Sequence, residues 1–557
     1  MKYLGTMYKS VLLKQALMAL TLVLYFGQLE AQAIYGKAAK LIANEKYSTA
    51  VAALNTYLIN EPKDEKAEYL LGKAYLGMEK YGAARAAFKS GAGHGSRYPM
   101  NHVGLGAVAV KNKNYEEAKE RMTKAIEVDR KNSIATLLGI AEGWLGYPDK
   151  GRKSKKAMMP YLKEAELYLY KVQKLDPQNA ASFVMLGELY DLQGVKELAE
   201  SNYEAAIARD PKYIRGYFRL GQLYKEQEKY NEAADKFRKI IELDAEYAPA
   251  FREMSEMWFL AKKYTKANEM MDQYLQLMGN DLGARLRKGV FEYLGEQYDK
   301  AIVTMEEVLP DTNSILLLRL IGYSYVKKET PDPDKSIEWL NRYFKTAQPI
   351  SYIASDYENM AKALELKGDK EGAVVQYEKA MKMSEEAGEP KPEILSNIAD
   401  MYKADKNYEK QAEYLERFLH TQKSYRLKQS FGLGLAYFQL KNYTRSDSVF
   451  QVMTEAKPDI TIGWAWRAKN NSQLDPGSKE GLAKPYYEKV LEIVGEDPEL
   501  IAKFKRDYIT ANKYLGAYYT LVTEEYAKAI PHWEKILTLK PEDEGATNGL
   551  NYCKDKG

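Results

Sequence analysis

The sequence has very little cysteine and histidine, which restricts the chemistry open to it. Among 557 residues there is one cysteine, Cys553. A single cysteine excludes an intramolecular disulfide and a zinc site built on a cysteine cluster. No two histidines stand at a helical metal-ligand spacing with a third ligand nearby, so neither a metal nor a cofactor is predicted. The four histidines are His94, His102, His420 and His532.

Sequence motifs of common catalytic sites are also missing. There is no G-x-S-x-G, H-E-x-x-H or C-x-x-C pattern. The glycine-rich stretch GAGHGS at 91–96 lacks the phosphate-loop signature and the preceding strand that such a loop requires, so we interpret it as a turn. These absences favour a protein that is not an enzyme. An enzyme with an unrecognised site remains the least favoured alternative.

The chain has no strong excess of charge of either sign. It holds 82 Lys and Arg against 78 Asp and Glu, a formal net charge of +4. Nucleic-acid binders usually show a clear basic excess, so that class is disfavoured. The hydrophobic share of 45% and the charged share of 29% are typical of a folded protein. The mean hydropathy of -0.52 argues against a protein with many membrane spans.

The N-terminus has the pattern of a secretory signal peptide. A start with three lysines leads into an uninterrupted apolar run at 16–26, and A-Q-A follows at 31–33. We expect residues 1–33 to be the signal peptide, with cleavage after Ala33. The apolar run is shorter than the ~20 residues that span a bilayer. An uncleaved anchor over residues 11–27 is the alternative, but Lys14 interrupts it.

Export without an anchor predicts a periplasmic or outer-membrane-associated protein. Bacterial lipoproteins carry a cysteine at the cleavage site, and this sequence has none there. Lipid anchoring by that route is therefore not expected. After cleavage we expect no transmembrane segment, although peripheral membrane association stays possible.

What the sequence does contain is a repeat. Residues 183–211 match residues 217–245 at a step of 34. Each unit has a small residue, a large one three positions later, a second small one nine after that, and an aromatic or large apolar residue four further on. We count fourteen units. Their first small residues are Ala38, Gly72, Gly106, Gly139, Gly187, Gly221, Ser255, Gly289, Gly322, Ala361, Ala399, Gly434, Ala468 and Gly516.

The second small position and the large position after it are equally regular. The second small position is Ala or Ser in every unit but one, where Gln411 stands. This spacing predicts two antiparallel helices per unit that approach each other where both side chains are small. The large residue would then fill the space against the neighbouring helix. These large residues are Leu54, Phe88, Met122, Leu169, Tyr203, Phe237, Met271, Met305, Leu340, Tyr377, Leu415, Phe450, Tyr487 and Trp533.

This pattern resembles the tetratricopeptide repeat family. The resemblance covers residues 34–541, and we expect 542–557 to form a short capping helix and tail. It implies an all-α fold, a right-handed superhelical solenoid of about fourteen antiparallel helix hairpins. No unit buries its apolar face alone, so stacking supplies the core. Many of the 46 tyrosines fall at the turn between the two helices of a unit, which suggests a structural role for them.

The repeat period slips at a few places. Gly139 and Ala165 are 26 residues apart, instead of the usual 12. The inserted stretch 147–160 is basic and could contact an acidic partner or an anionic membrane, or could simply be a solvated loop. Smaller slips suggest joints near 310–315 and 384–392. The basic residues of the insertion are Lys150, Arg152, Lys153, Lys155 and Lys156.

The resemblance also implies where a partner would bind. In the family, positions 2, 5, 9 and 12 of each unit tend to face the concave groove of the superhelix. Aromatic and charged side chains there suit an extended peptide or a partner helix. The alternative is that these residues pack between neighbouring helices. The candidates are Tyr69, Lys73, Arg215, Phe218, Gln222, Lys225, Arg252, Glu256, Phe259, Tyr293, Phe431 and Phe438.

We therefore expect a non-catalytic interaction scaffold or adaptor of the bacterial cell envelope. Its partners would be other proteins or extended peptides, bound in the concave groove. A second possibility is a peptide- or substrate-recognition component of an envelope assembly or secretion system.

Overall fold

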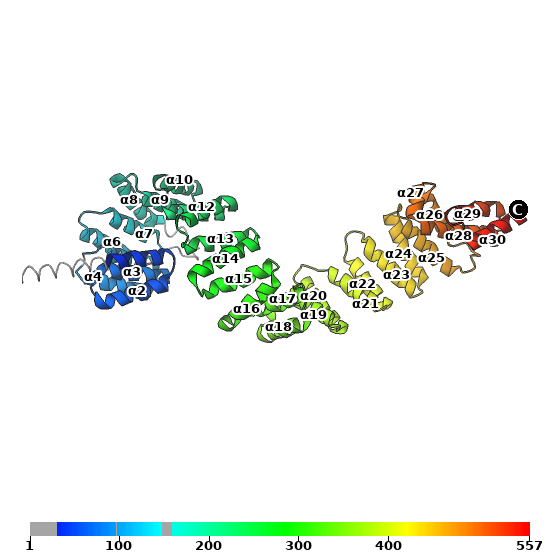
Figure 1. Cartoon of the computed structure of the whole chain (residues 1–557), viewed down its shortest axis with the longest axis horizontal. Coiled ribbons are helices and arrows are strands. Elements are labelled where there is room, and N and C mark those ends of the chain that lie inside the picture. Colours follow the sequence, from blue (N-terminus) through cyan, green and yellow to red (C-terminus); the bar gives the residue numbers. More distant parts are fainter. Residues whose placement is uncertain (1–30, 96, 147–158) are drawn as a thin grey trace, which may run out of the picture. The chain divides into compact units, whose positions relative to one another are not determined.

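The computed structural model describes residues 31–95, 97–146 and 159–557. Within these ranges the chain is helical and contains no strand (Figure 1). It divides into two compact units, one up to Leu317 and one from Leu318 onward. The division falls two residues beyond the first expected joint at 310–315. Residues 1–30 of the expected signal peptide and all five basic residues of the insertion lie outside the described residues.

Unit 1 is a row of eight helix hairpins in its described residues. We call the first helix of each hairpin the A helix and the second the B helix. The A helices are residues 31–43, α3 (Glu65–Gly77), α5 (Met100–Lys111), α7 (Ile134–Leu145), α9 (Ala180–Gln193), α11 (Ile214–Glu226), α13 (Ala248–Leu260) and α15 (Leu282–Leu294). The B helices are α2 (Tyr47–Asn60), α4 (Tyr81–Gly93), α6 (Tyr115–Val128), α8 (Met159–Leu175), α10 (Lys196–Arg209), α12 (Tyr230–Leu243), α14 (Tyr264–Met278) and α16 (Tyr298–Thr312).

Unit 2 continues the same scheme with six further hairpins, and the division between the units falls inside its first helix. Its A helices are α17 (Ile315–Lys327), α19 (Ala354–Lys367), α21 (Glu393–Ala404), α23 (Leu427–Gln439), α25 (Thr461–Leu474) and α28 (Lys505–Leu521). Its B helices are α18 (Pro333–Thr346), α20 (Lys370–Glu386), α22 (Tyr408–His420), α24 (Tyr443–Ala456), α26 (Lys484–Val494) and α29 (Tyr526–Leu539). The remaining elements are η2 (Pro349–Ser351), α27 (Pro498–Lys503) and the terminal α30 (Glu544–Lys556).

The small residues of the repeat provide the space into which the large ones pack. A Cβ added at Gly187 would lie 2.4 Å from the Tyr203 ring, and one added at Gly72 would lie 2.3 Å from the Phe88 ring. The Phe88 ring is also covered from the next A helix, where a Cβ at Gly104 would approach it to 2.4 Å. The predicted packing of small against large residues is confirmed, and it explains why bulky side chains are absent from these positions.

Serine replaces glycine or alanine in three of these contacts and makes a specific hydrogen bond. The Ser336 hydroxyl donates to the Gly322 carbonyl at 2.8 Å, and the Ser446 hydroxyl donates to the Gly434 carbonyl at 2.8 Å. Ser255 does the same in the opposite direction, from an A helix to Ala267 of the B helix. Each buried hydroxyl is therefore paired across the hairpin, which removes the cost of burying it.

One assignment in the repeat count is wrong. Gly139 does not face the large residue Leu169 of its own hairpin, because a Cβ there would meet Met100 and Val103 of α5. Ala141 is the eighth residue of α7, the place that Gly187 holds in α9, and it is fully buried. Gly139 and Ala141 are both small residues. The usual spacing of 12 residues to the second small position would distinguish them, but the long insertion after α7 changes that spacing.

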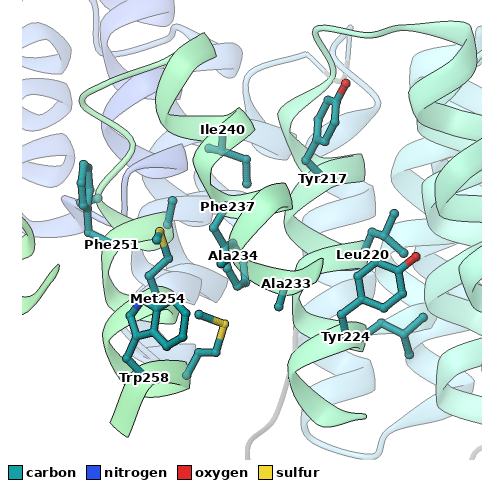
Figure 2. Packing of buried hydrophobic residues seen from close by; sticks show 14 of the residues in the cluster. Tyr217, Leu220, Tyr224, Ala233, Ala234, Phe237, Ile240, Phe251, Met254 and Trp258 are labelled. Atoms are coloured by element: carbon teal, nitrogen blue, oxygen red, sulfur yellow. The ribbon is translucent and has the colours of Figure 1, made fainter. Parts of the chain in front are cut away.

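The buried hydrophobic residues of the described ranges form three clusters in unit 1 and two in unit 2. Figure 2 shows a part of unit 1 in which Tyr217, Leu220 and Tyr224 of α11 lie beside Phe237 of α12, with Trp258 of α13 on the other side. This arrangement follows from stacking, because α12 packs against α11 of its own hairpin and against α13 of the next one.

The turns between the A and B helices share an unusual backbone conformation. In nine hairpins the residue two before the turn tyrosine has positive φ, and it is a glutamate or a lysine rather than glycine. The following tyrosine packs on the next A helix, as Tyr47 does over Gly77. These tyrosines are structural, as expected. The nine residues are Glu45, Glu79, Lys113, Glu228, Lys262, Glu296, Lys406, Lys441 and Glu524.

The C-terminal helix α30 covers the last hairpin. Cys553 on this helix is fully buried, and its Sγ lies 3.2 Å from the Thr520 hydroxyl of α28. It behaves as a small core residue. Across the described ranges, no helix has the length and apolar character needed to cross a membrane.

Candidate partner-binding site

The A helices of unit 1 form its inner face. From α3 to α13 the backbones of successive A helices approach one another within 8 Å at several positions. Charged side chains on these helices therefore reach not only the next A helix but also the one after it. The cations and amide predicted to face a groove lie here.

Glu142 of α7 is the first centre of this inner face. It accepts a hydrogen bond from Lys73 of α3 at 3.3 Å and another from Arg215 of α11 at 3.0 Å. These residues belong to the second, fourth and sixth hairpins, so one carboxylate links three alternate repeats. Burial raises the pKa of Glu142, but the two cations outweigh burial and lower it to about 2.

Glu188 of α9 is a second centre, directly beside the first. Arg215 donates to its Oε2 at 2.8 Å and Arg219 donates to its Oε1 at 2.7 Å. Only 11% of the Glu188 side chain is exposed. Burial raises its pKa, and the two guanidinium groups reverse this, so that the pKa is lowered overall.

Glu253 of α13 is the third centre. It accepts hydrogen bonds from Lys225 and from Gln222 of α11, the latter at 3.0 Å. Lys225 is also 3.5 Å from the Glu256 carboxylate. Although burial raises the pKa of Glu253, the charge and hydrogen bond of Lys225 lower it overall.

The two ends of this row meet. Arg252 of α13 pairs with Glu45, the positive-φ residue in the turn of the first hairpin, with Nη2 3.1 Å from Oε1. Lys40 of the first hairpin pairs with Glu246 at 2.7 Å. Residues of the first and seventh hairpins, more than 200 positions apart in sequence, are therefore in contact.

The ion-pair network on the inner face of unit 1 is neutral as a set. It pairs five cations with five carboxylates. The predicted groove residues Lys73, Arg215, Gln222, Lys225, Arg252 and Glu256 are all members of this network. The ten charged residues are Lys73, Arg215, Arg219, Lys225, Arg252, Glu45, Glu142, Glu188, Glu253 and Glu256.

The aromatic candidates of unit 1 pack against neighbouring helices. Phe218 meets Phe237 and Tyr247 edge-on, with ring centroids 6.1 and 5.8 Å apart. Phe259 of α13 stacks on Phe291 of α15 at 4.7 Å. The packing alternative is therefore what the structure shows for Phe218 and Phe259. The other two, Tyr69 and Tyr293, contact aromatic rings of their own hairpin or its flanking turn.

A pocket of about 270 Å³ lies beside the network of unit 1. Apolar residues such as Leu145 and Leu192 form part of its wall, and Glu188, Arg219 and Lys225 supply its charged groups. No group of three His, Cys, Asp or Glu side chains suited to a metal ion occurs in the part of the chain described by the structure.

The inner face of unit 2 is built differently. Phe431 and Phe438 of α23 both meet the Trp466 ring of α25 edge-on, at 6.2 and 5.1 Å. Lys469, one turn further along α25, places its Nζ 4.4 Å from the Trp466 ring centroid. Trp466 and Lys469 were missed in the sequence, although Lys469 is position 9 of its unit when the count starts at Thr461.

Sequence comparisons identify the repeats. The tetratricopeptide repeat model matches residues 35–99 in one version and 102–132, 180–213 and 214–247 in another. The C-terminal part of a TPR repeat-containing protein from Cytophaga hutchinsonii is 30% identical, and the match covers 47% of this chain and 98% of that one, with a TM-score of 0.37. The chain belongs to the tetratricopeptide repeat family.

Two further solved structures are similar to parts of the chain. A tetratricopeptide repeat protein from Parabacteroides merdae is 19% identical over 41% of this chain and 88% of that one, with a TM-score of 0.28. PilF from Pseudomonas aeruginosa is 21% identical over 40% of this chain and 96% of that one, with a TM-score of 0.30. No curated protein matches the chain.

Proposed function

We propose that the protein is a non-catalytic interaction scaffold or adaptor of the bacterial cell envelope, exported by its N-terminal signal and binding partner proteins along the inner faces of its A helices. The repeat family supports protein partners in general. The observation that carries the proposal is that hairpins of this family account for nearly all described residues, so the exposed helix faces are the principal surfaces available for function.

The inner face of unit 2 is the better placed of the two for a partner. Lys362 of α19 and Lys403 of α21 occupy positions 9 and 12 of their repeats and are exposed. Neither is held in an ion pair by a described carboxylate. A partner therefore meets free charges there without first breaking contacts inside the chain, which favours association.

Site-specific photo-crosslinking tests the inner face. A photoreactive amino acid replaces Lys362 or Lys403 on the inner face, and Val375 or Val452 as exposed controls on the B helices α20 and α24. After irradiation of living cells, we expect discrete adducts with the same envelope protein from the two inner positions and none from the controls. Adducts obtained only from the B-helix positions would contradict binding along the inner face.

Cell fractionation tests the compartment. We expect the chain in the periplasmic or outer-membrane fraction, with a mature N-terminus at Ile34 measured by mass spectrometry of the intact protein. Recovery of the full-length chain in the cytosol would contradict the envelope part of the proposal and leave protein binding as a separate question.

A further inference from the structure

An aromatic cluster joins two neighbouring A helices of unit 2. We call Phe431, Phe438, Phe450 and Trp466 the aromatic wall. Trp466 is stacked on Phe450 at 5.7 Å and is met edge-on by both residues of α23. Phe431 and Phe438 are seven residues apart on one helix, so the wall is roughly 10 Å long. Phe431, Phe438 and Trp466 are only half-buried, so part of the wall is open to solvent.

A cation stands at the edge of this wall without a carboxylate partner. Lys469 is half-buried beside Trp466, and within the described ranges no Asp or Glu lies within ion-pair distance of its Nζ. Burial lowers the pKa of Lys469. The charge of Asp507 raises this pKa and the charge of Arg506 lowers it, and the overall shift is downward. Its cationic form is thus less well solvated than in water and lacks the compensation that the cations of unit 1 receive.

The charge around Lys469 favours an anion. Arg506, at the start of α28, is exposed and is not ion-paired to a described carboxylate. Lys469 and Arg506 carry two positive charges, and Asp507 carries one negative charge. These three groups together are therefore net positive. A carboxylate brought by a ligand would gain a charge-assisted contact in a partly desolvated place, where such contacts are strongest.

We propose that the aromatic wall and Lys469 form a recognition site for a segment of a partner protein that presents an Asp or Glu side chain next to a large apolar side chain. The carboxylate pairs with the Lys469 ammonium group, and the apolar side chain packs on the exposed part of the aromatic wall. This inference rests on the proposed function and specifies the chemistry of the partner. The wall supplies contact area, and the lysine selects between carboxylate and amide.

Matched peptides in solution test the site. The probes are fluorescently labelled octapeptides, capped at both ends, whose two central residues pair Asp, Glu, Asn or Gln with Leu, Phe or Trp. Their affinity for the full chain is measured by fluorescence anisotropy. We expect at least one acidic peptide to bind about tenfold more tightly than its amide counterpart, a ratio that corresponds to about 1.4 kcal/mol.

Variants of the chain assign that preference to the site. Lys469→Met should abolish the difference between acid and amide while leaving weak binding of both, and Phe438→Ala should weaken both members of the pair. Lys345→Met, at an exposed lysine on the B helix α18 of the same unit, is the matched control and should change neither. Hydrogen exchange of α23 and α25 checks that each variant keeps its packing.

Three outcomes would overturn the assignment. They are the absence of binding by every peptide up to millimolar concentration, equal affinity for acid and amide, and a preference that survives Lys469→Met. Self-association in sedimentation velocity that Lys469→Met abolishes would assign the surface to a second copy of the chain instead. In each case crosslinks from Lys362 and Lys403 to an envelope protein would still support the proposed function, so the two failures are distinguishable.

Discussion

The two units are built from the same repeat but use their inner faces in opposite ways. In unit 1, ion pairs join alternate A helices and connect the first hairpin to the seventh, so the charges of this network are compensated within the chain. In unit 2 the ion pairs of the described residues join positions no more than 39 apart in sequence, and inner-face lysines such as Lys362 remain exposed. The shared repeat therefore does not determine whether the charges of an inner face are paired. The distribution of charged residues along the A helices determines it.

The largest expected effect comes from breaking the network of unit 1. Glu188→Ala leaves Arg215 and Arg219 without their shared carboxylate and should destabilise the surrounding hairpins by about 3–5 kcal/mol. Loss of amide-exchange protection in α9 and α11 is the measurement. Lys370→Ala in unit 2, which removes an exposed pair with Asp405, is the comparison and should cost less than about 1 kcal/mol. Equal costs would remove the contrast between the units.

Packing inside the hairpins should be equally sensitive in both units. A Cβ at Gly221 of unit 1 would lie 2.8 Å from the Phe237 ring, and one at Gly434 of unit 2 would lie 2.6 Å from Phe450. Gly221→Val and Gly434→Val should therefore each cost about 1–3 kcal/mol through overpacking. Denaturant unfolding of each variant measures this. A large cost in one unit and none in the other would mean that the hairpins are not equivalent.

Acid should reveal a half-buried histidine of unit 2. Burial, with a contribution from Lys535, lowers the pKa of His532 to about 4, and its Nδ1 lies 2.8 Å from the Asn512 side-chain oxygen. Because the folded-state pKa lies below the unfolded value of 6.5, its stability contribution is complete above pH 6.5 and declines as the pH falls toward 4. At pH 5 the loss should be on the order of 2 kcal/mol.

The variant His532→Gln isolates this contribution. It should flatten the pH dependence of unfolding between pH 6.5 and 4, measured by hydrogen exchange of α28 and α29. His420→Gln, at an exposed histidine of the same unit, should leave the profile unchanged. A profile that is the same in all three proteins would show that His532 does not titrate differently on folding.

The smallest expected effect concerns the turns. Glu228 has a φ of 60°, a backbone conformation that glycine adopts without steric cost. Two other turns of the chain already have glycine there, Gly194 and Gly368. Glu228→Gly in unit 1 and Lys441→Gly in unit 2 should therefore raise the free energy of unfolding by less than about 1 kcal/mol each. A destabilisation in either unit would show that the side chain contributes more than the backbone strain costs.

The sequence was sufficient for the repeat and its packing, because these depend on contacts between residues close in the chain. The contacts of Gly187 with Tyr203, and of Gly72 with Phe88, follow from a spacing of 16 residues that recurs throughout. The insertion after α7 shows the limit, since Ala141 rather than Gly139 holds the repeat position there.

The contacts between side chains on the inner faces could not be predicted from the sequence in the same way. The repeat places Arg215 and Arg252 on an inner face, but pairing of Arg252 with Glu45 depends on the curvature accumulated over six hairpins. Small rotations between successive repeats decide whether such residues meet, and no local pattern encodes their sum. Trp466 was missed for a related reason, because its neighbours Phe431 and Phe438 come from the adjacent repeat.

Lysine footprinting tests the contrast between the two units most directly. The full chain is treated briefly with an amine-acetylating reagent, and the modification rate of each lysine is measured by mass spectrometry. The account predicts slow modification of Lys73 and Lys225, which are held in ion pairs on the inner face of unit 1, and fast modification of Lys362 and Lys403 on the inner face of unit 2. Equal rates on the two inner faces would contradict it, because they would show that the inner face of unit 1 is as open as that of unit 2.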